Sequence, residues 1–155
     1  MPALPTRALL LAFASLAVTA FAAPPNACEI VNAEEINQFA ERKVEKVRLQ
    51  KAGNPSECAF LDSRNAAVLV VWMKEVQYAV KDELGTERGN LEKIYRVKAK
   101  ELETVGDGGF WLGANKSLWF RKGKLITSVT FQTPKNQNEV DTGQVARLVE
   151  SRLGK

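Results

Sequence analysis

Polar and apolar residues follow different periods in successive parts of the chain, and each period predicts an element of secondary structure. Asn32 and Glu35 have the spacing of a helix capping box, and the apolar residues Ile36 and Phe39 follow at helical spacing. This pattern predicts a short helix that begins at about Ala33.

The segment after this helix is compatible with two readings. Val44 and Val47 continue the helical spacing, whereas Val47 and Leu49 alternate with basic and polar residues, as in a strand. We expect a strand over 44–50. Turn-forming residues at 52–56 then separate it from the next apolar run.

Two apolar runs, 58–61 and 66–73, predict further strands, and the second is apolar enough to be a central, buried strand. A second helix is predicted over about 76–95, because apolar residues fall along one side of it at Val76, Val80, Leu84, Leu91 and Tyr95. Gly85 and Gly89 each weaken this helix by about 1 kcal/mol relative to alanine.

The last third of the chain predicts a hairpin and a helix. We expect a connection over 98–109 with a short strand at its start, and then a hairpin of 117–120 and 125–133 that turns at Gly123. Asn138 begins a final helix, whose buried face consists of Val145, Leu148, Val149 and Leu153.

The order of these elements predicts the fold class. Short links between successive strands favour antiparallel pairing, and the helices alternate with groups of strands. We therefore expect a single α+β domain over 23–155, in which about three helices pack against an antiparallel β-sheet.

The first 22 residues have the pattern of a cleaved signal peptide. Arg7 precedes a 14-residue uncharged stretch, 8–21, that is mainly Leu, Ala, Val and Phe and ends in Ala20-Phe21-Ala22. A membrane anchor would need about 20 apolar residues. Lipidation at Cys28 is the other alternative, but Pro25-Asn26-Ala27 is a poor lipobox. We expect a periplasmic or secreted protein.

Cys28 and Cys58 are the only cysteines of the chain. An even pair in an exported domain predicts a disulfide. A zinc site would need four nitrogen or sulfur ligands, and the chain has no histidine. We expect no metal and no cofactor.

Charge changes this picture little. Without residues 1–22 the formal charge falls from +4 to +3, and the two signs are interleaved along the chain. The densest basic run is Arg42, Lys43, Lys46, Arg48 and Lys51, interrupted by Glu45. We interpret it as a solvated surface, with binding of a polyanion or the envelope surface as the alternative, and expect no nucleic-acid partner.

A glycine-rich segment, 105–111, is the strongest candidate for a binding site. Its glycines would let backbone amides approach a ligand, and nearby aromatic rings would offer a stacking surface. The other reading is a turn that folds its aromatic residues into the core. The candidate ligand-binding residues are Asp107, Phe110, Trp111 and Trp119.

The chain resembles small exported bacterial proteins of unknown function, similar to the DUF3558-type lipoprotein group. Val105 and Gly109 depart from the pattern of that group, where glycine and alanine would stand. The resemblance implies a fold and a compartment and brings no catalytic residues. It rests on Cys28, Glu34, Glu35, Cys58, Gly106, Asp107, Phe110, Trp111, Lys122 and Gly123.

The sequence favours a binding domain over an enzyme. Without histidine and with both thiols oxidised, the commonest catalytic bases and nucleophiles are missing. We expect a non-catalytic domain that binds a protein or a small ligand. The alternative enzyme is a carboxylate-dependent hydrolase that uses Asp107 and a second acid.

Overall fold

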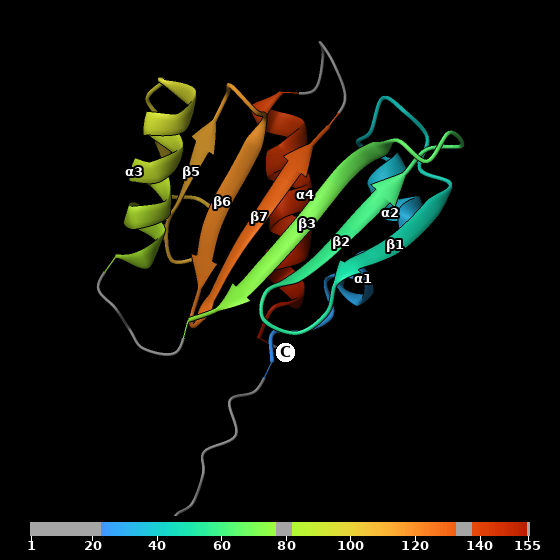
Figure 1. Ribbon diagram of the computed structural model, residues 1–155, viewed down its shortest axis with the longest axis horizontal. Helices are drawn as coiled ribbons and strands as arrows, with labels where there is room; N and C mark the ends of the chain where they lie inside the picture. Colours follow the sequence, from blue (N-terminus) through green and yellow to red (C-terminus); the bar gives the residue numbers. More distant parts are fainter. Residues whose placement is uncertain (1–22, 77–81, 133–137, 155) are drawn as a thin grey trace, which may run out of the picture.

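The computed structural model describes residues 23–76, 82–132 and 138–154 (Figure 1). The predicted signal peptide, residues 1–22, lies outside the described residues, as does Val80 of the predicted second helix.

Seven antiparallel strands form one sheet in the order β1-β2-β3-β7-β6-β5-β4, so β1 and β4 are its two edges (Figure 1). The central pair, β3 and β7, joins the N-terminal hairpins to the C-terminal ones. The strands are β1 (Lys46–Lys51), β2 (Ser56–Leu61), β3 (Ala67–Glu75), β4 (Lys100–Leu102), β5 (Gly109–Leu112), β6 (Ser117–Lys122) and β7 (Leu125–Phe131).

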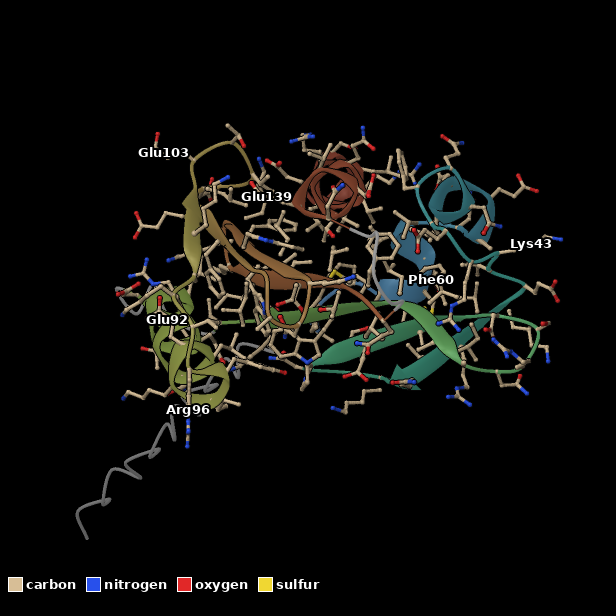
Figure 2. All side chains as sticks on the ribbon, turned by 90° about the horizontal axis from the view of Figure 1, so that it is seen from above. Lys43, Phe60, Glu92, Arg96, Glu103 and Glu139 are labelled. Atoms are coloured by element: carbon tan, nitrogen blue, oxygen red, sulfur yellow. A yellow bond between two sulfur atoms is a disulfide. The ribbon has the colours of Figure 1, made fainter. Side chains whose placement is uncertain are left out.

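The helices lie on both sides of the sheet (Figure 2). On one side, α4 crosses β6 and β7, and α1 and α2 lie beside it; α3 lies on the other side, next to β5 and β6. The helices are α1 (Ala27–Ile30), α2 (Ala33–Asn37), α3 (Glu83–Tyr95) and α4 (Glu139–Arg152).

The prediction of an α+β fold with about three helices is wrong, because a single seven-stranded sheet dominates the described residues and the four helices among them are short. Two of them, α1 and α2, have four and five residues. The short strand expected at the start of the 98–109 connection is β4. Strand β5 was not predicted, because its glycine-rich start resembles a turn.

The predicted second helix begins later than its apolar spacing suggests. Strand β3 continues to Glu75, and the Val76 N–H donates to the Lys124 carbonyl at 2.8 Å, as in a further strand residue. The helix begins only after Asp82, whose carboxylate caps it by accepting from the Gly85 N–H at 2.9 Å.

The predicted caps of two helices, α2 and α4, are confirmed. Asn32 and Asn138 each form a capping box, with Glu35 and Asp141 respectively. The reciprocal hydrogen bonds satisfy backbone N–H groups that have no partner inside the helix, which explains why sequence identified both starts correctly.

The main core lies between the sheet and helices α1, α2 and α4. Phe60, Phe120 and Phe131 are fully buried there with Val145 and Val149 of α4, and Figure 2 shows Phe60 on the side covered by α1 and α2. Burying each large apolar side chain contributes about 1.5–3 kcal/mol. This core occupies one face of the sheet, and α3 lies on the other.

The predicted disulfide is confirmed. Cys28 of α1 and Cys58 of β2 are bonded, with their Cα atoms 5.1 Å apart. A second contact supports this junction, because the Ala27 N–H donates to the Ser56 hydroxyl at 3.0 Å. Within the part of the chain that is described, no helix is long and apolar enough to cross a bilayer.

Candidate functional site

Phe110 and Trp119 form the centre of the candidate site. They lie directly opposite each other on β5 and β6, and their rings stack with centroids 6.1 Å apart and planes 6° apart. Trp72 of β3 extends this row, with its ring centroid 5.4 Å from that of Trp119. Because Phe110 is 2% exposed, it forms a floor and offers little free surface.

Trp111 lies on the opposite face of the sheet. Successive residues of a strand point to opposite faces, so Trp111 points away from the side of Phe110. Its register partner, Leu118, packs against α4, and Trp111 packs against the same core. The structure therefore brings Phe110 and Trp119 together and separates Trp111 from them.

Asp107 fixes the glycine-rich loop to the turn between β6 and β7. Its carboxylate Oδ2 accepts from the Gly123 N–H at 2.7 Å, and its own N–H donates to the Arg121 carbonyl at 2.7 Å. The Arg121 N–H in turn donates to the Gly108 carbonyl at 3.0 Å. Asp107 itself remains exposed to solvent while it orders the loop.

Two glycines permit this close approach of the loop to β6. Gly106 has φ +62°, and a Cβ there would lie 2.1 Å from the Arg121 carbonyl oxygen. A Cβ at Gly109 would lie 2.5 Å from the Trp119 carbonyl oxygen. The glycines thus serve backbone packing, which supports the reading of a turn that places Phe110 in the interior.

A pocket of about 410 Å³ lies between α3 and this loop. Leu84, Leu102 and Phe110 give it apolar walls, while acidic groups and one guanidinium surround them. Of the predicted site residues, Asp107 and Phe110 line it. Gly108 and Gly109 of the same predicted segment line it too. The other lining residues carried no signal of a site in the sequence, and they are Asp82, Leu84, Gly85, Arg88, Glu101, Leu102 and Glu103.

The charged residues of the pocket differ in whether they have a hydrogen-bond or ion-pair partner. Arg88 of α3 pairs with Glu101 of β4 and closes one side. Asp82 is occupied by capping α3. Glu103 has no hydrogen bond or ion pair with the described residues, and Figure 2 shows its side chain at the outer margin, directed away from α3. Carboxylates still outnumber the single guanidinium around the pocket.

The described residues contain no group of three or more acidic or thiol side chains arranged to hold a metal ion. The carboxylates of the pocket are therefore considered as charges and hydrogen-bond acceptors.

The basic run at 42–51 is partly occupied by internal contacts. Arg42 donates to Asp62 and to the Ala67 carbonyl, both at 2.8 Å. Lys46 donates to the Asn65 side chain, and Lys51 pairs with Glu57 at 3.2 Å. These contacts favour the prediction of a solvated surface for most of the run.

Comparison with protein-family models gives no match to this chain, and comparison with curated proteins gives none either. The resemblance to the DUF3558-type group stays a prediction.

Proposed function

We propose that this chain is an exported, non-catalytic binding domain, periplasmic or secreted, whose pocket between α3 and the glycine-rich loop takes a small cationic ligand. The observation that carries the proposal is the pocket itself, with apolar walls and an excess of carboxylates. Such a lining suits an ammonium or guanidinium group on a short hydrocarbon body, because opposite charges attract and the hydrocarbon leaves water.

Export is supported by the disulfide. Bonds of this kind persist in oxidising compartments and are rare in the cytosol. The Cys28–Cys58 bond fits the leader-like pattern of residues 1–22.

Binding is favoured over hydrolysis because three of the four carboxylates that line the pocket already have structural partners. Asp107 accepts from Gly123, Asp82 caps a helix, and Glu101 pairs with Arg88. Hydrolysis by a carboxylate pair, as in glycosidases, needs two carboxyl groups that face the substrate and differ in protonation. A carboxylate-dependent hydrolase remains the second candidate, since these acids line one pocket with Asp107.

The proposal can be tested by titrating the mature protein with agmatine and 1,4-diaminobutane, with glutamate as the anionic control. Asp107→Asn removes a charge, but its amide oxygen can still accept from Gly123. Glu45→Gln is the matched control, because Glu45 is exposed and directly precedes β1, at the opposite edge of the sheet from the pocket. We expect weak, saturable binding of the cationic probes that Asp107→Asn weakens several-fold and Glu45→Gln leaves unchanged.

Two outcomes of this titration would contradict the proposed ligand class. If neither cationic probe binds, or if glutamate binds equally well, the proposed ligand class is wrong. Hydrolysis of a glycoside or ester substrate that Asp107→Asn abolishes would favour the enzyme instead.

A further inference from the structure

Strand β1 is an open edge of the sheet, at the opposite end from the pocket (Figure 1). All six of its residues are exposed, and β2 is the one strand that pairs with it in the described parts of the chain. An exposed edge presents backbone N–H and C=O groups to which a further strand can bond.

The two faces of β1 differ in chemistry. Val47 and Leu49 lie opposite Phe60 and Cys58, on the face of the sheet that the N-terminal helices cover. They are 42% and 41% exposed, which is high for apolar residues beside a core. Of the alternate residues, Lys46 and Arg48 are basic and Gln50 is polar, so apolar and basic side chains face opposite sides of the same edge.

A small pocket adjoins the apolar face of this edge. Its volume of about 120 Å³ is of the size of a single side chain. Leu49 forms one wall, and the other walls come from the N-terminal segment and the β1–β2 turn, namely Pro24, Asn26, Ala52, Gly53 and Ser56.

Part of the basic charge at this edge has no internal partner among the described residues. Five bases and one acid lie between residues 42 and 51, against a surplus of +3 for residues 23–155. Arg48 and Lys43 form no side-chain hydrogen bond or ion pair with any described residue, and Figure 2 shows Lys43 projecting outward. Charge complementarity at this edge therefore favours an acidic partner.

We propose that β1 binds an extended acidic segment of a partner protein by strand addition. Backbone hydrogen bonds to β1 would supply affinity, an apolar side chain would contact Val47 and Leu49 and enter the small pocket, and alternating carboxylates would face Arg48. A second copy of this chain fits less well, because two β1 edges would bring like charges together.

The experiment uses a six-residue peptide that alternates glutamate and valine, added to the mature protein. Amide hydrogen exchange of β1 reports strand addition, because newly bonded amides exchange more slowly. The same peptide with N-methylated backbone amides serves as a control. We expect the unmodified peptide to slow exchange in β1, and Arg48→Glu to weaken its binding about tenfold.

Lys124→Glu is the matched variant, because it makes the same charge change at an exposed position in the β6–β7 turn. It should leave peptide binding within about twofold, since a solvent-exposed charge far from the peptide is screened. Equal loss in both variants, or binding of the N-methylated peptide, would overturn strand addition.

Other occupants of the edge are outcomes of the same test. Heparin binding that depends on Arg48 without peptide-induced protection of β1 amides would show a polyanion surface and contradict the proposal. A dimer of the free protein with protected β1 amides that the peptide does not displace would assign the edge to a second copy. None of these outcomes involves the α3 pocket.

Discussion

Arg152, near the end of α4, binds Glu35 of α2 with both of its terminal nitrogens, across 117 residues of sequence. The same guanidinium donates to the Ile30 carbonyl at the end of α1, at 2.6 Å. One side chain thus joins the last helix to the first two. Glu35 has a double role, because it also completes the capping box of α2.

Replacing Arg152 should loosen this junction. Arg152→Ala removes the ion pair and the bond to Ile30, so we expect a lower denaturation midpoint in urea. Glu35→Gln should cost less than about 1 kcal/mol, since the pair is partly exposed to solvent. Arg147→Ala is the control, as Arg147 is exposed on the same helix and has no ion pair with the described residues. If Arg152→Ala and Arg147→Ala lowered the denaturation midpoint equally, Arg152 would not stabilise the junction between the helices.

The free energy of unfolding should fall in acid, in part because the ion pair between Glu35 and Arg152 is lost. Hydrogen bonding from Arg152 holds the pKa of Glu35 below its ordinary value of about 4.5, and burial opposes it. A lowered folded-state pKa means that the stabilisation is complete above the unfolded value and disappears as pH falls through the folded one. Urea denaturation from pH 6 to pH 3 should therefore show a smaller pH dependence for Glu35→Gln. An unchanged dependence would refute this assignment.

Replacing a glycine of the loop by alanine should destabilise the protein, whereas the same replacement in α3 should stabilise it. Gly106→Ala places a Cβ against the Arg121 carbonyl at positive φ and should cost about 2 kcal/mol or more. Gly89→Ala meets no atom within 4 Å in a helix and should stabilise by about 1 kcal/mol. Thermal unfolding of both variants tests this, and a tolerated Gly106→Ala would mean that the loop is not packed on β6.

Asp107 should contribute to stability through a hydrogen bond. Asp107→Ala leaves the Gly123 N–H without its acceptor and should cost about 1 kcal/mol, whereas Asp107→Asn retains an acceptor and should cost less. Comparing the two variants in urea separates the structural role from any role in binding. A greater loss in Asp107→Asn would contradict the observed geometry.

The disulfide should be needed for stability. Closing a loop with a sequence separation of 30 lowers the free energy of folding by about 3.5 kcal/mol in the chain-entropy model. The double variant Cys28→Ser, Cys58→Ser should lose about this amount in urea denaturation under oxidising conditions. Reduction of the native protein should give the same midpoint as the variant, and a midpoint unaffected by either change would contradict the prediction.

Sequence predicted best the elements that carry a local signal. The capping residues Asn32 and Asn138 and the alternation around Val47 located two helix starts and an edge strand correctly. The strand β5 was missed because it begins with glycine, which sequence patterns associate with turns. Gly109 is needed there because the Trp119 carbonyl lies too close for a Cβ, and the local sequence does not reveal this tertiary contact. The start of α3 was misplaced because β3 continues into the same apolar stripe.

The candidate site was only partly predictable for the same reason. Asp107 and Phe110 stood out within one segment, but the rest of the pocket comes from α3 and β4, which only the fold brings there. Trp111 was grouped with Phe110 because they are adjacent in sequence. Once the segment is a strand, adjacent side chains must point to opposite faces.

The central claim, that the pocket beside Phe110 binds a ligand, is tested most directly by the indole N–H resonances of the three tryptophans during titration with agmatine. Trp119 stacks on Phe110, whereas Trp111 lies on the far face of the sheet. Conservative Trp→Phe variants assign the signals. The account predicts that the Trp119 resonance shifts and saturates while that of Trp111 stays in place. Equal shifts of both resonances, or no shift of Trp119 at saturating agmatine, would contradict it.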